Sequence, residues 1–273
     1  MTNPSARKIL IVTVIYNQRI ADTNVYKTLL SEKEDVYIYD NSPAAQPTDW
    51  IPSNWVYISD PSNPGLSSAY NKAARYAACK GYDWLLISDQ DTIYPQRALD
   101  LYRSYIGNHL SSKMFIPKVK ISDGCYLSPV RNRKYLVRIS HKLPLSGEIN
   151  LNRFAVINSG ILVTTDSFLS CGGYNDKVFL DFSDFQFIER FGNLYNTVYV
   201  TDIICQQDFS DVNDDTDKKL HRFELFCLSL KEYECLKKKN RIFIHLAVIK
   251  RTFALSAKLK SLIPIKLFFS RYL

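Results

Sequence analysis

Short apolar runs alternate with stretches of helical periodicity over about the first 120 residues of the chain. The apolar runs predict strands over residues 9–15, 35–39, 55–58, 84–88 and 114–117. Helical spacing of apolar positions predicts helices over about 22–31, 66–79 and 95–109. This alternation is typical of an α/β fold with a mainly parallel sheet and helices on both faces.

The pattern changes after residue 118. Runs with strand character over 119–127, 134–140 and 154–164 predict a small antiparallel extension. Next we expect a helix over about 181–191 and a strand over 197–201. An acidic loop over 208–217 and helices over most of 217–260 should follow. With no internal repeat and no clean linker, we expect one principal domain over 1–212 and a C-terminal helical appendage over 213–273.

Composition and charge narrow the class of protein. The 273 residues are 46% hydrophobic and 23% charged, which excludes a disordered or fibrous chain. The net charge of +8 is uneven, because residues 235–273 hold ten Lys and Arg and no Asp or Glu, which leaves −2 on 1–234. A nucleic-acid-binding protein would carry its charge with a recognisable motif, and none is present, so no nucleic-acid partner is expected.

The cysteines and apolar segments bear on where the protein works. Six cysteines stand without a CxxC pair or zinc-type spacing, which favours reduced thiols in a cytoplasmic protein. Arg7 and Lys8 before the apolar run imitate a signal peptide, but the run passes directly into Asn17 with no convincing cleavage site, so a buried first strand is expected. No run reaches the ~18–20 apolar residues of a membrane-spanning helix.

In parallel sheets ligands bind beyond the carboxyl ends of the strands, so the residues after each apolar run are candidates for a site. The most informative is Trp84-Leu-Leu-Ile-Ser-Asp89-Gln-Asp91-Thr92. Two carboxylates spaced i, i+2 at the end of a buried strand repel each other unless a cation or hydrogen-bond donors offset the charge, which favours a metal and phosphate site. A plain strand-end turn that caps the next helix explains the pair equally well.

The DxDxT pattern of Asp89, Asp91 and Thr92 also matches haloacid-dehalogenase-like phosphatases. That class normally carries the motif after its first strand and adds a later Lys and a second acidic pair after another apolar strand. Here the motif follows the fourth apolar run, and Asp214-Asp215 lie in a polar stretch. The phosphatase is therefore the second hypothesis.

Six motifs in order resemble the family-2 glycosyltransferases of the GT-A fold, particularly the rhamnosyltransferase-like branch that builds bacterial surface polysaccharides such as O-antigen and capsule. The resemblance covers about residues 8–212. The motifs are Val12-Thr-Val-Ile-Tyr-Asn17, Tyr39-Asp40-Asn41-Ser42, Asn63-Pro-Gly65-Leu-Ser-Ser-Ala-Tyr-Asn71-Lys-Ala, Ser88-Asp89-Gln-Asp91, Asn158-Ser-Gly160, and Gly172-Gly173-Tyr174 leading to Phe179-Leu-Asp181-Phe-Ser-Asp184-Phe-Gln-Phe-Ile-Glu-Arg190.

The resemblance implies an inverting transferase that moves a sugar from a nucleotide-sugar donor, for example dTDP-rhamnose or a UDP-sugar such as UDP-galactofuranose, to a hydroxyl of a glycan or lipid-linked oligosaccharide. It implies that the donor is bound by Thr13, Asn17, Asp40, Asn63, Gly65, Asn71 and Asp89. Without the resemblance, the composition of Asp40-Asn41-Ser42-Pro43 supports a plain turn as well as a donor site. For Asn63, a helix cap would then be the better explanation.

The resemblance further implies that Asp91 ligates a divalent cation, Mg²⁺ or Mn²⁺, which bridges the donor diphosphate. The acid six residues before Arg190 deprotonates the acceptor in this family, and that position is Asp184. The acceptor is expected to bind to Asp181 and Gly160. Asp181 stands three residues before Asp184 and shares its face if the segment is helical. The alternative is that the carboxylates only favour the start of a helix.

The chain departs from the family after the strand at 197–203, where a His that often ligates the metal or a phosphate is replaced by Ile204-Cys205-Gln206-Gln207-Asp208. Asp208 can substitute for it, or the metal has fewer protein ligands. His221 stands thirteen or more residues too late and is expected on a helix surface. The acidic stretch 211–217 imitates a calcium loop but lacks its mid-loop Gly and distal Glu, so a solvated loop is expected.

The basic tail predicts a peripheral association with the inner face of the membrane. Helical projection places Lys250, Arg251 and Lys258 in one band, with Ile242, Leu246, Ile249 and Phe253 on another side, as in helices that lie on anionic lipid. Alternatively these apolar residues pack on the principal domain or on a second copy of the chain. A non-enzymatic hypothesis also stands, in which the chain is a polysaccharide- or membrane-binding module with a catalytically dead fold.

Overall fold

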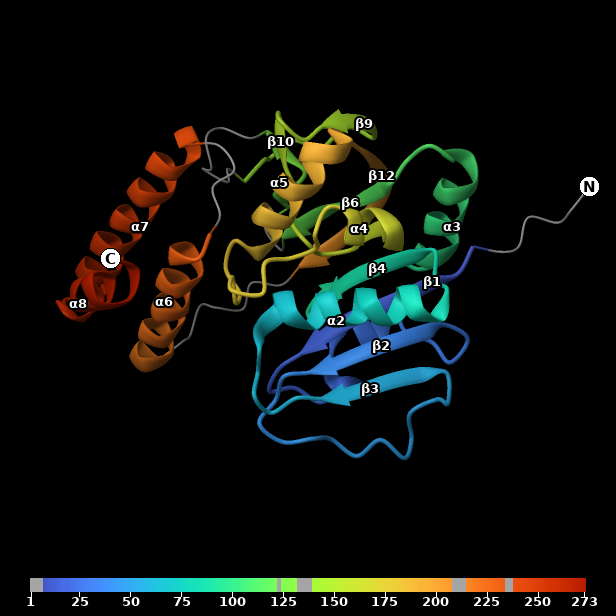
Figure 1. Cartoon of the computed structure of the whole chain (residues 1–273), viewed down its shortest axis with the longest axis horizontal. Helices are drawn as coiled ribbons and strands as arrows, with labels where there is room; N and C mark the ends of the chain where they lie inside the picture. The colour runs from blue at the N-terminus through green and yellow to red at the C-terminus, as the bar shows by residue number, and fades with distance from the viewer. Residues whose placement is uncertain (1–6, 122–123, 132–138, 208–214, 234–237) are drawn as a thin grey trace, which may run out of the picture.

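The computed structural model describes residues 7–121, 124–131, 139–207, 215–233 and 238–273. A large mixed sheet forms its centre (Figure 1), with strands in the order β3-β2-β1-β4-β11-β6-β12-β5. In that order the strands are Trp55–Ser59, Asp35–Asp40, Ile9–Ile15, Trp84–Asp89, Ile161–Thr164, Met114–Ile121, Thr197–Gln207 and Thr92–Ile93. Two strands lie off this path: β7 (Tyr126–Ser128) pairs with β6, and β9 (Gly147–Asn150) with β12. A separate pair joins β8 (Val130–Arg131) and β10 (Phe154–Ala155).

The sheet is parallel where the sequence predicts it. Strand β1 pairs in parallel with β2 and β4, and β2 with β3, so the carboxyl ends of these four strands share one edge. Strand β11 enters antiparallel between β4 and β6, and β12 is parallel to β6. The five strands predicted in the first 120 residues are confirmed, and the α/β class with an antiparallel extension is confirmed as well.

Alternating side chains of the strands feed two apolar layers, one on each face of the sheet. On one face Leu10, Val12 and Val14 pack with α2 (Gly65–Lys80), α4 (Thr165–Ser170) and α5 (Ser183–Tyr195). On the other face Ile11 and Ile15 pack with α1 (Asn24–Thr28) and α3 (Ala98–Asn108). The predicted cover of helices on both faces is therefore confirmed.

Several predicted boundaries were wrong for local reasons. The helix expected over 22–31 is reduced to a 3₁₀ turn, Ile20–Asp22, and the short α1, which Thr23 caps by accepting from the Tyr26 amide. The strand expected over 197–201 continues to Gln207 through an irregularity between Val200 and Ile204, where the exposed Asp202 interrupts the apolar pattern.

Two further boundaries differ. The run 154–164 is two strands, β10 and β11, and helix α4 follows without having been predicted. Helix α5 begins at Ser183 rather than at Asp181, because Phe182 has a left-handed backbone (φ 67°) that a helix cannot include. The predicted strand over 134–140 and the loop over 208–217 fall largely outside the described residues.

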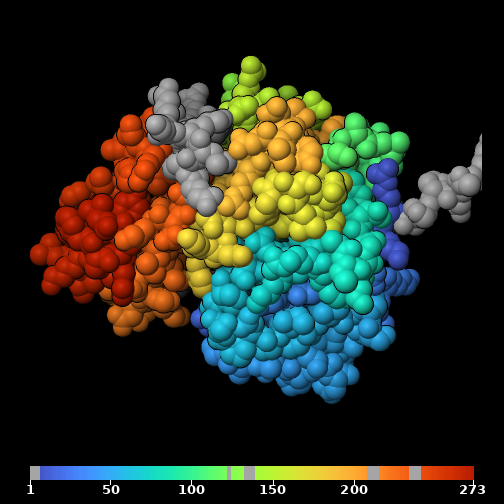
Figure 2. All heavy atoms as spheres, viewed as in Figure 1, coloured from blue at the N-terminus to red at the C-terminus, as the bar shows by residue number. Residues whose placement is uncertain are grey.

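The C-terminal segment forms a helical unit beside the sheet, consisting of α6 (Thr216–Lys231), α7 (Lys238–Leu259), α8 (Ile263–Leu267) and a π-helical turn, Phe268–Tyr272. In Figures 1 and 2 it stands as a lobe to the left of the sheet and its covering helices. Phe223, Phe226, Ile244, Val248 and Tyr272 are among the residues of its own apolar core. None of the helices within the described ranges combines the length and the hydropathy needed to cross a bilayer.

Five of the six cysteines lie within the described residues. Cys79, Cys125, Cys171, Cys205 and Cys227 are all free, and three of them are buried. Cys235 lies outside the described residues. His221 is exposed on α6, as predicted.

Candidate functional site

Polar residues gather where β1, β2 and β4 end, at the edge of the sheet that faces α6 (Figure 1). Asp89 is the last residue of β4. The hydroxyl of Tyr70 donates to its Oδ1 and the hydroxyl of Ser159 to its Oδ2, each at 2.9 Å. Burial raises the pKa of Asp89, and these two hydrogen bonds oppose that rise by stabilising the charged form. The first carboxylate of the DxD pair is thus held in a fixed orientation by α2 and by the 158–160 segment.

Asp91 lies two residues further on, at the turn before β5. Its backbone carbonyl accepts from the side-chain amide of Asn24, at 3.1 Å. The Gln207 amide nitrogen is 3.4 Å from its Oδ1. Strand β5 pairs with β12 so that Thr92 faces Gln207, which brings the end of β12 beside the DxD pair.

Asp184 lies in the first turn of α5, where its Oδ1 accepts from the backbone amide of Phe185 at 2.8 Å. Part of the residue reaches the surface, but its carboxyl group is enclosed, and burial raises its pKa to about 7. The negative charges of Asp89 and Asp181 raise it further, which places these three carboxyl groups within electrostatic reach of one another. A carboxylate with this pKa is suited to accept a proton near neutral pH.

Asp181 precedes α5 instead of sharing its face with Asp184, because the helix begins only at Ser183. The expectation of two carboxylates on one helical face is therefore wrong, although both belong to the same cluster. Arg222 of α6 is 3.0 Å from Asp181 Oδ1. The other oxygen, Oδ2, is buried and has no hydrogen-bond partner in the part of the chain that the structure describes.

The phenylalanines around Asp184 are divided between two cores. Phe182 and Phe185 pack on the appendage, where Phe182 lies edge-to-face with Phe226 and Tyr233. Phe187 instead belongs to the core under the sheet and stacks on Tyr174. The segment that carries Asp184 is thus packed between the sheet and the appendage.

Asp40 is fully buried at the end of β2. Its Oδ1 accepts from the Ser42 amide at 2.9 Å, and its Oδ2 accepts from Gln46 Nε2 at 2.9 Å and from the Tyr57 hydroxyl at 2.7 Å. These contacts hold the 40–46 loop closed over the carboxylate, so a ligand can reach it only after the loop moves. Asn17, exposed and with a left-handed backbone (φ 51°), lies against this loop through its amide, which donates to Ser42.

Gly65 and Asn71 make contacts within the chain. A Cβ on Gly65 (φ +89°) would stand 2.5 Å from the Phe179 carbonyl oxygen, so glycine is required by the approach of the 179 segment. The Asn71 amide donates to the Tyr174 carbonyl and to Asp176 and accepts from the Tyr174 amide. Asn63, partly buried with φ 46°, closes the turn after β3 by donating its amide to the Asp60 carbonyl.

Thr13 and Gly160 lie deeper in the fold. Thr13 is buried within β1, and within the described ranges its hydroxyl has no hydrogen-bond partner. Gly160 accepts from the Tyr102 hydroxyl at 2.6 Å, and an added Cβ would stand 2.8 Å from Pro117 and 3.1 Å from Tyr102. Neither residue meets the Asp89–Asp184 cluster in a contact that identifies a ligand site.

A cationic network at the same edge has no counterpart in the predicted site. Lys72 of α2 forms an ion pair with Asp60 at 3.0 Å, and both contact the Tyr39 hydroxyl in short hydrogen bonds. Hydrogen bonds from Ser62, Tyr39 and Lys72 hold the pKa of Asp60 well below its usual range. The position of Asp60 after a strand was the only signal in the sequence, and nothing there paired it with Lys72.

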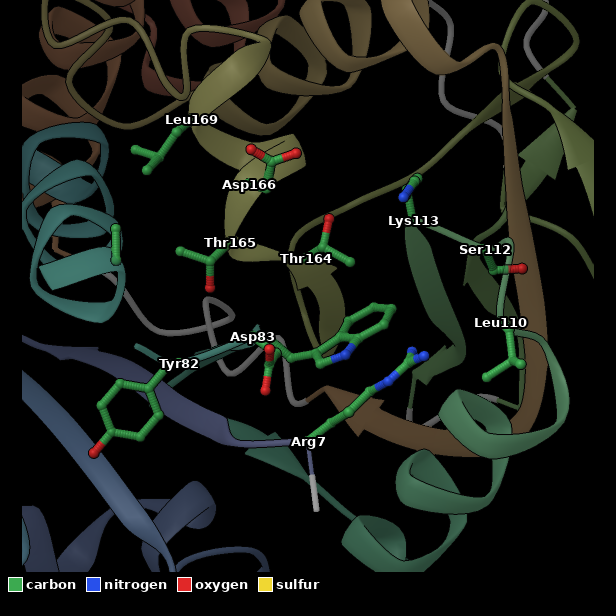
Figure 3. A pocket seen from close by; sticks show the side chains of 12 residues that line it. Arg7, Tyr82, Asp83, Leu110, Ser112, Lys113, Thr164, Thr165, Asp166 and Leu169 are labelled. Carbon is green, nitrogen blue, oxygen red and sulfur yellow. The ribbon is translucent and has the colours of Figure 1, made fainter. Parts of the chain in front are cut away.

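The structure also contains a cavity of about 580 Å³ at the opposite edge of the sheet (Figure 3). Its lining includes Arg7, Asp83, Lys113, Thr165 and Asp166, which lie near the amino ends of β1, β4 and β6 and the start of α4. None of the predicted site residues lines it. We place the candidate site at the carboxyl edge, because the carboxylate with a pKa near neutrality lies there.

The residues at the carboxyl edge fit a hard divalent cation in their chemistry. Among the residues that the structure describes, no cluster of three or more His, Cys, Asp or Glu side chains is placed to hold a metal. Asp91 nevertheless supplies a carboxylate, and Gln207 beside it has a buried carbonyl oxygen that no described residue contacts by a hydrogen bond. Carboxylate and amide oxygens are ligands that Mg²⁺ and Mn²⁺ accept. Asp208, the residue predicted to substitute for the missing His, lies outside the described residues.

No protein-family model matches the chain, and no curated protein sequence matches it. Solved structures do resemble it in fold. S. aureus TarS 1–349 superposes with a TM-score of 0.53 at 14% identity, over 92% of this chain and 73% of that one. The same protein in complex with UDP-GlcNAc superposes with a TM-score of 0.53 at 12% sequence identity, over 90% of this chain and 73% of that one. GalNAc-T7 with UDP, GalNAc and Mn²⁺ superposes with a TM-score of 0.58 at 10% sequence identity, over 89% of this chain and 55% of that one. The chain therefore shares the GT-A-type fold of these structures.

Proposed function

We propose that the protein is a metal-dependent, inverting glycosyltransferase that uses a nucleotide-sugar donor. The observation that carries this proposal is Asp184, a carboxyl group with a pKa raised to about 7 that lies within electrostatic reach of Asp89, the first carboxylate of the DxD pair. The GT-A-type fold supports it, and structures of TarS and GalNAc-T7 contain UDP or UDP-GlcNAc. The donor nucleotide is expected at the carboxyl edge of the sheet.

In the proposed mechanism, Asp184 accepts the proton of the acceptor hydroxyl while that oxygen bonds to the anomeric carbon. Attack from the side opposite the leaving nucleotide diphosphate gives inversion of configuration. Asp91 would hold a divalent cation, which supplies Lewis-acid stabilisation of the diphosphate charge when bound. Asp89, fixed by Tyr70 and Ser159, would orient the ribose or the sugar.

The remaining predicted contacts extend this proposal. We assign the acceptor side to Asp181 and Gly160, and the donor side to Thr13, Asn17, Asp40, Asn63, Gly65 and Asn71. Asp40 requires opening of the 40–46 loop, since Ser42, Gln46 and Tyr57 occupy its carboxylate. Gly65 and Asn71 would act on the donor indirectly, by holding the 174–179 segment. A role in the synthesis of bacterial surface polysaccharide, with a rhamnosyl or galactofuranosyl donor, is the finer form of the proposal.

The test separates the transferase from its rivals. Purified protein is screened with nucleotide sugars, with and without Mn²⁺, for thermal stabilisation and for transfer to glycan acceptors. Stabilisation by one nucleotide sugar and release of the nucleoside diphosphate upon transfer would support the proposal. Release of inorganic phosphate from a sugar phosphate without acceptor would instead support the phosphatase, whose motif normally follows the first strand, whereas Asp89 ends the fourth. Donor binding without turnover across acceptors would support the dead module.

We further propose that the appendage, which we take as a unit over 213–273, binds the inner membrane surface and brings the enzyme to a lipid-linked acceptor. The apolar residues expected to face lipid do not pack on the principal domain: Ile242, Leu246 and Phe253 are 63%, 55% and 63% exposed. They project from the side of α7 opposite Ile244 and Val248, which are buried in the appendage core. Lys250 and Lys258 are exposed nearby, whereas Arg251 stacks on Phe226 at 4.0 Å.

A sedimentation assay tests the membrane surface. Leu246→Ser with Phe253→Ser should reduce binding to vesicles that contain phosphatidylglycerol, while Leu110→Ser, an exposed leucine of the principal domain, should not. Truncation of the tail is a poorer probe, because Ile244 and Val248 belong to the core of the appendage. Unchanged vesicle binding in the double variant would contradict the membrane proposal, and a change from dimer to monomer would show that a second copy covers this face.

A further inference from the structure

Gln207 is the last residue of β12 and lies beside the DxD pair because β12 pairs with β5, where Gln207 faces Thr92. Its side chain is more than nine-tenths buried, with only 9% of the residue exposed. The amide nitrogen points to Asp91 Oδ1 at 3.4 Å, and the amide oxygen is buried with no hydrogen-bond partner among the residues that the structure describes. The register of the sheet therefore fixes an uncompensated polar oxygen next to the carboxylate of Asp91.

This arrangement is unfavourable as a purely structural contact. A buried carbonyl oxygen without a donor costs about 1–3 kcal/mol, and an N···O distance of 3.4 Å exceeds the usual range for a hydrogen bond. An apolar side chain of similar size would avoid that cost. Since buried polar groups are normally satisfied, the unpartnered oxygen indicates a partner that the described residues do not provide.

A divalent cation on Asp91 is such a partner. Rotation of the terminal amide by about 180° exchanges its nitrogen and oxygen, and places the oxygen where the nitrogen now faces Asp91. A carboxylate and an amide carbonyl then face the same point in space, and both are hard ligands. The amide adds no charge, so it does not add to the repulsion between Asp89, Asp91 and Asp184.

We propose that the side-chain carbonyl of Gln207 is a ligand of the divalent cation held by Asp91, at the end of the strand where the resemblance leads one to expect a histidine. The inference rests on the proposed function for the presence of the cation. It adds that the protein ligands at this point are all oxygens. Such a set favours Mg²⁺ and Mn²⁺ over Zn²⁺, which prefers nitrogen and sulfur.

The competing explanation is that Gln207 only ties the end of β12 to the turn before β5. A structural role of this kind would show as a lower melting temperature in Gln207→Ala with no specific change in metal affinity. Gln206 is a matched control, because it is the neighbouring glutamine of the same strand but is exposed. Gln206→Ala makes the same chemical change on the opposite face.

The experiment titrates the purified full-length chain with Mn²⁺ alone and measures free Mn²⁺ by electron paramagnetic resonance. Gln207→Ala should weaken Mn²⁺ binding about 10-fold or more, since loss even of a group that only supports a ligand costs 10- to 100-fold. Gln207→Glu should bind at least as tightly as the wild type, and Gln206→Ala should be unchanged. In Gln207→His, electron spin echo modulation should show ¹⁴N coupling to Mn²⁺ that the wild type lacks.

Two results would overturn the inference. One is wild-type Mn²⁺ affinity in Gln207→Ala while Asp91→Ala binds none. The other is a loss in Gln207→Ala that Gln206→Ala reproduces. Thermal stabilisation by nucleotide sugars in the presence of a chelator, in wild type and Gln207→Ala alike, tests the transferase separately. Donor binding without any Mn²⁺ binding would therefore overturn the role of Gln207 and leave a metal-independent transferase.

Discussion

Replacement of Asp184 by Asn tests the proposed base through two independent properties. The amide keeps the size of the side chain and one acceptor for the Phe185 amide, but it cannot accept a proton from the acceptor hydroxyl. Loss of a general base is expected to lower kcat by about 10²-fold or more, with nucleotide-sugar affinity nearly unchanged. The wild-type kcat/KM should rise with pH and level off above about pH 7, where Asp184 is ionised.

The same substitution should stabilise the fold at high pH. The folded-state pKa of Asp184, about 7, exceeds its ordinary value of 3.8, so the folded state binds a proton more tightly than the unfolded state does. The stability that the wild type gains from this tighter proton binding is fully present below pH 3.8, and it is lost as the pH rises to about 7. About three pKa units at 1.36 kcal/mol each give an upper bound of about 4 kcal/mol. Because part of the residue reaches the surface, we expect about 2 kcal/mol or more.

Urea unfolding of metal-free protein between pH 4 and pH 8 measures how the ionisation of Asp184 changes the free energy of unfolding. The free energy of unfolding of Asp184→Asn should exceed that of the wild type by an amount that grows with pH and levels off above pH 7. Asp166→Asn is the matched control, because Asp166 is an exposed carboxylate in the first turn of α4. A pH-independent difference between Asp184→Asn and the wild type, together with near-normal kcat, would refute the assignment of the base. A dead Asp181→Asn beside it would show that the motif was aligned three residues off.

Two further substitutions test the proposed metal site and the glycine of α2. Asp91→Ala should abolish the Mn²⁺-dependent part of thermal stabilisation by a nucleotide sugar, because a carboxylate ligand is lost; undiminished activity in this variant, or in wild type with excess chelator, would exclude a metal mechanism. Gly65→Ala should lower the free energy of unfolding by about 1–3 kcal/mol, because its Cβ would meet the Phe179 carbonyl, whereas Gly81→Ala, also at positive φ but with open space around it, should cost less.

The fold was predictable where local pattern and topology agree. Apolar runs such as 84–88 are long enough to be buried strands, and their alternation with helices requires parallel pairing. The prediction failed where a single residue overrides the pattern. The exposed Asp202 in β12 reads as a strand end but lies in an irregularity of a strand that continues, and the left-handed backbone of Phe182 delays the start of α5.

The site was predictable only in part, because side-chain contacts between distant segments leave no local pattern. The position of Asp89 and Asp91 after a buried strand follows from their sequence alone. The approach of Asp184 to Asp89 depends on packing of α5 against the sheet, and the loop that closes over Asp40 depends on Gln46 and Tyr57. Gln207 has no signal in the sequence, because its place beside Asp91 depends on the register of β12 with β5.

The contact between Arg222 of α6 and Asp181 gives a last prediction. Substitutions of these two residues should shift the pH dependence of kcat/KM in opposite directions. Arg222 lies 3.0 Å from Asp181, whose negative charge raises the pKa of Asp184. Arg222→Met leaves that charge uncompensated, so the rise of kcat/KM should move to higher pH. Asp181→Asn removes the charge, so the rise should move to lower pH, with a higher acceptor KM. The Arg222 side chain is half-exposed, so each shift should stay below about 0.7 pH unit, equivalent to ~1 kcal/mol. In the Asp181→Asn background, Arg222→Met should shift nothing further. Shifts of equal sign in the two single variants would show that α6 acts on Asp184 by displacing its backbone and not through charge.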